Sequence, residues 1–239
     1  MSELLPQLIQ QLFNGLSLGA IYALIAIGYT MVYGIIGMIN FAHGEIYMIG
    51  AYVGLVTLSA IGTQSGLPVY VIIGLMLLVA VVLTGVYGFV VEQVAYKPVR
   101  HGPRLVALIS AIGMSIFLQN WVALGQGARD MAVPSLIPGA LRFGAEGAFE
   151  IYIPYSRVMI IVVAVALMIA LTLYIKHSRM GRASRACSQD MHMANLLGID
   201  TNRVISFTFI LGAMLAAVGG VLIALAVGKL NPFIGFLVG

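Results

Sequence analysis

The feature that most constrains the fold of this chain is a series of long apolar segments, each long enough to cross a bilayer. An α-helix of about 20 apolar residues spans the roughly 30 Å hydrocarbon core of a membrane. Lipid offers the backbone no hydrogen-bond partners, so a continuous apolar run must satisfy its own peptide groups, as a helix does. The sequence therefore predicts an all-α, polytopic transmembrane helical bundle of six spans, with the start of a seventh from Phe233 on. The six predicted spans cover residues 12–36, 44–61, 69–94, 105–124, 157–175 and 204–228.

Composition excludes a soluble domain and a membrane β-barrel. Of the 239 residues, 61% are hydrophobic and only 8% are charged, whereas soluble domains carry about 25% charged residues. Barrel strands show short segments of alternating hydrophobicity, but the apolar runs here are continuous. All eight prolines lie in the predicted loops or at the ends of spans, as expected for a residue that interrupts helical hydrogen bonding. We expect a single transmembrane domain over residues 1–239, incomplete at its C-terminus.

The positive charges predict which side of the membrane each loop occupies. Lysine and arginine gather in loops 97–104 and 176–203, while segment 125–156 has three acidic residues and two arginines. Because cytoplasmic loops are enriched in Lys and Arg, we expect the two basic loops in the cytoplasm and segment 125–156 outside. Counting back places the turn at 37–44 inside and the N-terminus outside. The net charge of +4 indicates contact with membrane lipid and no nucleic-acid partner, since the basic residues lie beside spans.

The sequence lacks the motifs of common catalytic and cofactor sites. It has no GxxxxGK[ST] loop for nucleotide phosphates and no GxSxG or HExxH motif, and its four histidines are scattered. Its one cysteine, Cys187, cannot form an internal disulfide. We therefore expect no catalytic residue, no metal site and no bound cofactor. No pattern supports a membrane hydrolase with a nucleophile and a base on facing helices.

The first two predicted spans are joined by a short polar elbow, residues 40–45. One interpretation is structural: Asn40 caps a helix, Glu45 satisfies first-turn amides and His43 lies at the membrane interface. The other is a direct role in gating transport, because ionisable residues at membrane depth are costly and are often functional. The expected cytoplasmic position favours a structural role or an inner gate. The elbow reads Asn40-Phe41-Ala42-His43-Gly44-Glu45.

The loop at 176–203 predicts a short amphipathic helix on the cytoplasmic side. Its apolar residues recur at helical spacing from Ala186 to Leu197, and Gly198 suits a C-terminal cap. The loop is longer than a connection between spans requires. Two interpretations stay open: a basic loop held near anionic lipid, and a helix that docks into a groove of a cytosolic partner.

Two stretches carry a family resemblance. Residues 15–54 read GLSLGAIYALIAIGYTMVYGIIGMINFAHGEIYMIGAYVG, and residues 181–204 read GRASRACSQDMHMANLLGIDTNRV. They resemble the permease subunits of bacterial ATP-binding-cassette (ABC) importers for branched-chain amino acids, in particular the first of the two paired permeases of the leucine/isoleucine/valine system. Related permeases for urea, short amides and other small amino acids have similar elbows, so these substrates stay open. Members of the family continue with further spans, so the resemblance implies a C-terminal truncation relative to them.

The resemblance implies a complex and a mechanism. In such importers two permeases form the pathway, two cytosolic ATPase subunits bind ATP and dock beneath them, and a periplasmic binding protein delivers the substrate. This chain would then be a multi-pass protein of the bacterial inner membrane, with a periplasmic N-terminus, that works by alternating access and hydrolyses no ATP itself. By similarity to the coupling segment of these permeases, ATPase contacts are expected at Gly181, Arg182, Arg185, Ala186, Ala194 and Gly198.

An ion- or proton-coupled carrier is the main alternative from another class. Such a carrier needs intramembrane acids to carry the coupling ion. The acids near the predicted spans are Glu45 and Glu92, and both are expected at cytoplasmic ends. Their position argues against ion coupling.

Overall fold

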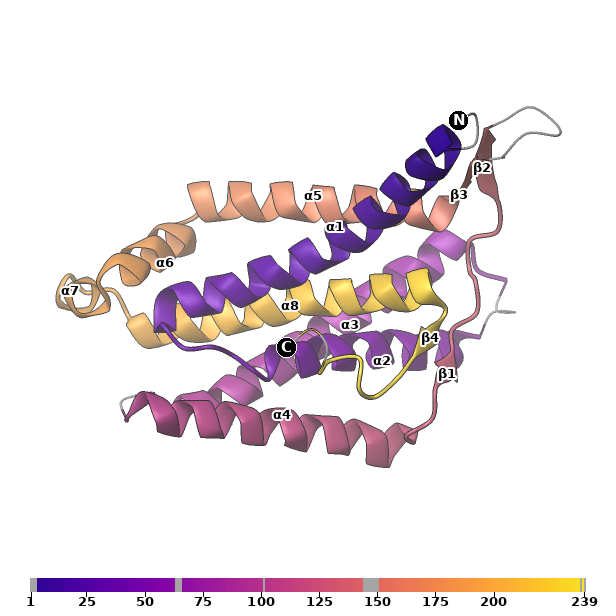
Figure 1. Cartoon of the computed structure of the whole chain (residues 1–239). Helices are drawn as coiled ribbons and strands as arrows, with labels where there is room; N and C mark the ends of the chain where they lie inside the picture. The colour runs from indigo at the N-terminus through magenta and orange to yellow at the C-terminus, as the bar shows by residue number, and fades with distance from the viewer. Residues whose placement is uncertain (1–3, 63–65, 101, 144–150, 237, 239) are drawn as a thin grey trace.

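The structure, a computed structural model, describes residues 4–62, 66–100, 102–143, 151–236 and 238. Within these residues it is a bundle of long helices, six of which are long and apolar enough to cross a membrane (Figure 1). The predicted all-α polytopic bundle and its six spans are confirmed. The helices are α1 (Leu4–Ile36), α2 (His43–Ile61), α3 (Val69–Val91), α4 (Arg104–Gln126), α5 (Tyr155–His177), α6 (Arg179–Gln189), α7 (Met191–Leu196) and α8 (Thr201–Val227), and a π-helical turn (Glu92–Tyr96) extends α3.

Local sequence explains where the helices begin. Helices α3, α4 and α5 each start directly after a proline, at Pro68, Pro103 and Pro154. The fixed φ angle of proline and its missing N–H suit the start of a helix. Helices α6, α7 and α8 each start after a Ser or Asp whose side-chain oxygen accepts a hydrogen bond from the first turn. The positions of proline in the sequence were therefore reliable guides to the boundaries.

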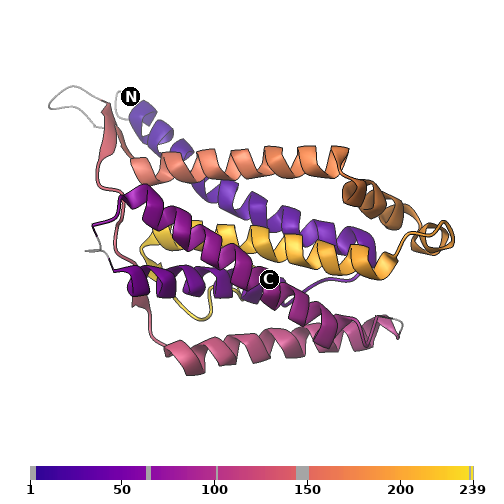
Figure 2. The same ribbon diagram turned by 180° about the vertical axis from the view of Figure 1, so that it is seen from behind.

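Helix α8 forms the centre of the bundle, and α1, α2 and α3 pack around it (Figures 1 and 2). Its buried face is rich in Gly and Ala, which lets other helices approach closely. At Gly220 an added Cβ would collide with the backbone of Tyr47 and Ala51 on α2. At Gly50 on α2 an added Cβ would collide with Ala217. This close contact fixes α2, and with it the polar elbow, against the centre of the bundle.

Two short antiparallel strand pairs lie at one end of the bundle, where β2–β3 lies near the N-terminal end of α1 and β1–β4 lies below it (Figure 1). The pair β1–β4 links the segment after α4 to the end of α8, and β2 pairs with β3. The backbone N–H of Tyr152 donates to Gln10 Oε1 of α1 at 2.8 Å. Residues 144–150, which include Glu146 and Glu150, lie outside the described residues. The strands are β1 (Met131–Ala132), β2 (Ala140–Phe143), β3 (Ile151–Pro154) and β4 (Lys229–Leu230).

Two expected elements differ from the structure. The predicted seventh span does not begin as a helix, because residues 232–236 form turns. Gly235 in these turns packs against the backbone of Gly44, at the start of α2. The single short helix expected in the cytoplasmic loop is two helices, because Asp190 has extended backbone (φ −152°, ψ 104°) between α6 and α7.

Candidate functional site

The polar elbow lies about halfway through the bundle, and the expectation of a cytoplasmic position is wrong. After α1 the chain turns back toward the middle of the bundle, and α2 begins there (Figure 1). The His43 ring lies against Gly212, about halfway along α8, and Glu45 contacts Ser115, about halfway along α4. Charge counts locate the ends of spans, so they could not reveal a chain that re-enters the bundle.

Asn40 and His43 are buried against aromatic side chains, and each is only 1% exposed. The Tyr96 hydroxyl donates to Asn40 Oδ1 at 2.7 Å. The Tyr29 ring stands edge-on to the His43 ring, with 5.7 Å between the centroids. Helix α2 begins at His43 and has no side-chain cap, so the expected cap at Asn40 and the expected interfacial position of His43 are both wrong.

Glu45 places a carboxyl group at the same depth, and it is also 1% exposed. The Ser115 hydroxyl donates to its Oε1 at 3.3 Å, while Oε2 faces Gly235 and has no hydrogen-bond partner among the described residues. Asn40 Nδ2 and His43 Nε2 are likewise buried without a partner there. Each such atom costs about 1–3 kcal/mol in a folded protein. Three of them in one short segment are typical of a site that binds a polar group or rearranges during function.

The elbow therefore supplies donors, acceptors and a carboxyl group at a depth where lipid offers none. Such a site can hold the polar part of a solute, or close a pathway and open when the helices around it move. Among the described residues, no group of His, Cys, Asp and Glu is arranged to hold a metal ion. The chemistry that the elbow supports is hydrogen bonding and charge pairing.

Local capping fixes both helices of loop 176–203. The side chains of Ser178 and Asp190 cap α6 and α7 respectively. Gly198 follows the last turn of α7, and its φ of +84° is strained for any residue with a Cβ. The N–H of Ile199 donates to the Ala194 carbonyl at 3.0 Å, which is the closure of a Schellman motif. The C-terminal cap expected at Gly198 is confirmed.

The six residues expected to contact an ATPase differ in accessibility. Gly181 and Ala194 are buried, and Ala186 is half-buried. An added Cβ at Gly181 would collide with the backbone of Ile175, so this glycine lets α6 pack on the end of α5. The two arginines among the six donate to backbone carbonyls near the end of α5. The exposed members are Arg182, Arg185 and Gly198.

The structure adds three residues that the expected set did not contain. Met193, Leu196 and Leu197 are 51%, 69% and 75% exposed, and we call them the α7 tip. They lie outside the six candidate spans. Their spacing of i, i+3 and i+4 was visible in the sequence. Only the structure shows that Ala194 lies on the buried side of α7 and that the three residues of the α7 tip lie on the exposed side.

A second polar cluster, which we call the inner tie, joins the end of α3 to the start of α8. Glu92 is 1% exposed in the π-helical turn. Its Oε2 accepts from Ser206 Oγ at 2.9 Å and from Gln93 Nε2 at 2.5 Å, and its Oε1 lies 3.9 Å from Arg100 Nη1. Arg100 also donates to Asn202 at the start of α8. The inner tie thus connects the basic turn before α4 to the helix that follows α7.

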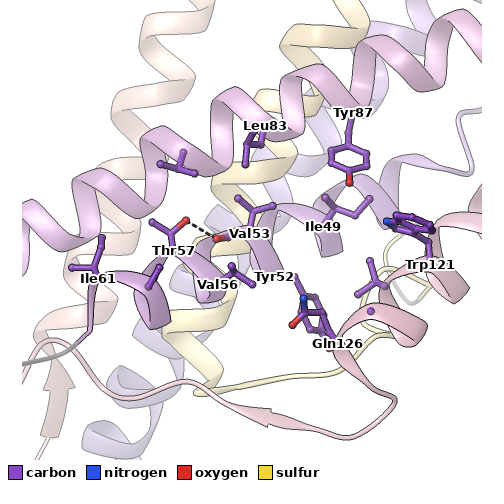
Figure 3. A pocket seen from close by; sticks show the side chains of 14 residues that line it. Ile49, Tyr52, Val53, Val56, Thr57, Ile61, Leu83, Tyr87, Trp121 and Gln126 are labelled. Atoms are coloured by element: carbon purple, nitrogen blue, oxygen red, sulfur yellow. Dashed lines mark hydrogen bonds between the residues drawn. The ribbon is translucent and has the colours of Figure 1, made fainter.

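An apolar hollow of about 470 Å³ lies between α2, α3 and α4. Figure 3 shows Val53 and Val56 of α2, Leu83 of α3 and Trp121 of α4 around it. The Tyr52 hydroxyl is buried beside this hollow without a hydrogen-bond partner in the described chain. The hollow separates α4 from α3 at this level, and α4 packs mainly against α2 and the π-helical turn.

Known proteins resemble the chain along its whole length. Residues 11–239 match the family described as the permease component of branched-chain amino acid transport systems. The high-affinity branched-chain amino acid transport system permease proteins LivH of Salmonella typhimurium and of Escherichia coli K12 are each 52% identical to it, over 100% of this chain and 78% of the relative. The corresponding protein BraD of Pseudomonas aeruginosa is 50% identical, over 97% of this chain and 75% of its own length.

No solved structure matches the chain. The family match covers nearly every residue, and it includes both the elbow and helices α6 and α7. The helical bundle is also what a multi-pass permease requires. The chain therefore belongs to the family of permease components of branched-chain amino acid transport systems.

Proposed function

We propose that this chain is a permease subunit of an ATP-driven importer that moves branched-chain amino acids across the bacterial inner membrane. The observation that carries this proposal is the 52% identity to LivH permeases over the whole chain. The partners would be a second permease, two cytosolic ATPase subunits that bind the ATP, and a periplasmic protein that delivers the substrate. The N-terminus would lie in the periplasm and α6 and α7 in the cytoplasm.

Transport in this proposal follows alternating access. ATP binding draws the two ATPase subunits together, and α6 and α7 move with them. Helix α6 packs on α1, α5 and α8, so its movement shifts the helices that surround the elbow. The buried polar atoms of Asn40, His43 and Glu45 then gain partners as the elbow opens, which lowers the cost of opening.

The α7 tip is the proposed contact with the ATPase. An exposed apolar helix face beside a basic surface fits an apolar groove with an acidic rim. Replacing Leu196 with Glu should therefore reduce co-purification of the ATPase and abolish coupled uptake, while insertion and melting temperature stay close to wild type. His192→Glu is the matched control, because His192 is also exposed on α7 and lies outside the apolar tip. Normal ATPase binding by the Leu196→Glu variant would show that the α7 tip does not contact the ATPase.

Reconstitution tests the function itself. The complex in proteoliposomes should take up radiolabelled leucine only with ATP and a loaded binding protein. Excess isoleucine or valine should compete, while urea and short amides should not. Competition by urea or an amide alone would assign the chain to a different substrate class.

The depth of Glu45 makes one control essential. A carboxyl group halfway through the bundle is also what a proton-coupled carrier uses. Leucine uptake without ATP that collapses when the proton gradient is discharged would show that the transporter is ion-coupled. Uptake that needs ATP and survives an uncoupler supports the proposal.

A further inference from the structure

One face of α1 differs from the other membrane-facing surfaces. Its residues lie alternately four and three positions apart, which places them along one side of a helix. Tyr22 and Tyr33 are each 50% exposed, and an added Cβ at Gly15 or Gly19 would meet nothing within 4 Å. We call this face the tyrosine stripe, and it consists of Gly15, Gly19, Tyr22, Ala26, Tyr29 and Tyr33.

The tyrosine stripe does not have the composition of a lipid-facing surface. The exposed side chains near the middle of α3 are aliphatic, such as Leu78 and Val82, and so are Val162 and Val165 of α5. Tyrosine favours the two membrane interfaces, but the Tyr29 ring touches His43, halfway through the bundle. Phenol groups at that depth gain from water or a polar solute, which lipid cannot replace.

The stripe is also hollowed and is continuous with the elbow. A hollow of about 360 Å³ is lined by Tyr22 and Tyr29, and another of about 330 Å³ is lined by Tyr33. Behind Tyr29 lie His43 and Asn40, each 1% exposed and each with a side-chain nitrogen that has no partner in the described chain. The stripe therefore leads from the surface of the bundle to buried polar groups that lack hydrogen-bond partners among the described residues.

From these features we infer that the tyrosine stripe forms one wall of the aqueous path along which the substrate crosses the membrane. This rests on the proposed function, in which the substrate is an amino acid with an aliphatic side chain. The tyrosine hydroxyls would hydrogen-bond the ammonium and carboxylate groups of that substrate, and the Gly and Ala positions leave room for its side chain. This chain borders the stripe at two places, because Val238 lines the hollow beside Tyr29, and Leu105 and Leu108 of α4 line the hollow beside Tyr33. The second permease would supply the rest of the opposite wall.

Cysteine labelling in the assembled transporter tests this inference. In a Cys187→Ala background, Gly19→Cys and Ala26→Cys place one thiol on the stripe, and Val82→Cys and Val165→Cys place one on aliphatic faces at similar depth. The probe is a charged methanethiosulfonate, which reacts with the thiolate and so needs water at the sulfur. Rates are measured in proteoliposomes, without nucleotide and with trapped ATP.

The expected result is that Gly19→Cys and Ala26→Cys react at least about tenfold faster than both controls in one of the two states, because only a hydrated thiol ionises. Rates equal to the controls in both states, in vesicles that still take up leucine, would overturn the inference and leave the proposed function intact. Fast labelling of the stripe in vesicles that take up no leucine would support the path and count against the proposed substrate.

Discussion

At the scale of single residues, the two buried polar clusters of this permease differ in what their carboxyl groups meet. In the inner tie, Glu92 accepts two hydrogen bonds and its Oε1 lies 3.9 Å from Arg100 Nη1. In the elbow, the Glu45 carboxyl group accepts one hydrogen bond. Both clusters contain buried polar atoms without a partner among the described residues, in Glu92 and Arg100 of the inner tie and in Asn40, His43 and Glu45 of the elbow. The ion pair of the inner tie is suited to hold the ends of α3 and α8 together, and the elbow is suited to respond when the helices around it move.

The inner tie predicts a coupled effect on stability. Arg100→Gln should destabilise the protein by about 3 kcal/mol, because it leaves the buried Glu92 carboxylate without its cation. The double variant Arg100→Gln and Glu92→Gln should recover part of that loss. Thermal melting in detergent measures both, and Lys176→Gln, at an exposed position outside the inner tie, is the control. If the double variant lost as much free energy of unfolding as the two single variants lose together, the two side chains would not interact.

Cys187 offers a second test at this scale. The side chain is 2% exposed within α6, and burial raises the pKa of its thiol. A raised pKa leaves less thiolate at a given pH, so alkylation by iodoacetamide should be slow near pH 8 and should accelerate as the pH rises. Cys187→Ala with Ser188→Cys moves the thiol to the exposed neighbouring position and should react faster. Equal rates for the two positions would contradict the packing of α6.

At the scale of elements, the contact between α2 and α8 holds the elbow at its depth. Gly and Ala on both helices let the backbones approach until a single Cβ at Gly220 would strike the backbone of α2. Such spacing was visible in the sequence as small residues four apart, but the same pattern occurs on α1. Gly15 and Gly19 of α1 have no neighbour within 4 Å of an added Cβ. The pattern alone therefore does not distinguish a contact inside the chain from an open face.

The close contact predicts an asymmetry between glycines. Gly220→Val should destabilise the protein by about 1–3 kcal/mol and reduce the folded yield, because α2 must move to admit the side chain. Gly74→Val is the matched control: it also lies within a span, and an added Cβ there meets nothing within 4 Å. Melting temperature and the monodisperse fraction in detergent are the measurements. If Gly74→Val lowered the melting temperature as much as Gly220→Val does, the contact between α2 and α8 would not be the cause of the destabilisation.

At the scale of the whole molecule, the sites are arranged along α8. The inner tie reaches Asn202 and Ser206 near its start, and the elbow lies against Gly212 near its middle. Helices α6 and α7 directly precede it, while α4 packs mainly on α2 and the π-helical turn. A displacement of α6 and α7 would therefore be transmitted along α8 to the elbow.

This arrangement predicts opposite sides for two exposed serines. In the Cys187→Ala background, Ser188→Cys on α6 should react with a membrane-impermeant maleimide only in inside-out vesicles. Ser135→Cys, which follows β1, should react in intact cells whose outer membrane has been permeabilised. Both serines are exposed, so a difference in labelling reports the side of the membrane. Labelling of both cysteines from one side would contradict the six-span topology, and a reversed result would invert the orientation.

The sequence by itself determined the class of fold, the spans and the family. Long apolar runs leave only helices as a solution in lipid, and prolines mark where α3, α4 and α5 begin. It also located the elbow and loop 176–203 as the polar exceptions. These properties depend on residues close together in the chain, so composition and spacing are enough to read them.

Tertiary structure decided the depth of the elbow, the division of the cytoplasmic loop and the accessible residues on it. Glu45 was expected at a cytoplasmic end, yet it meets Ser115 halfway along α4. Ala194 was expected to contact a partner, yet it is buried and Leu196 is exposed. Each of these outcomes depends on contacts between segments far apart in the chain, which charge counts and helical spacing do not contain. The position of a polar side chain in a membrane bundle is set by the helix that packs against it.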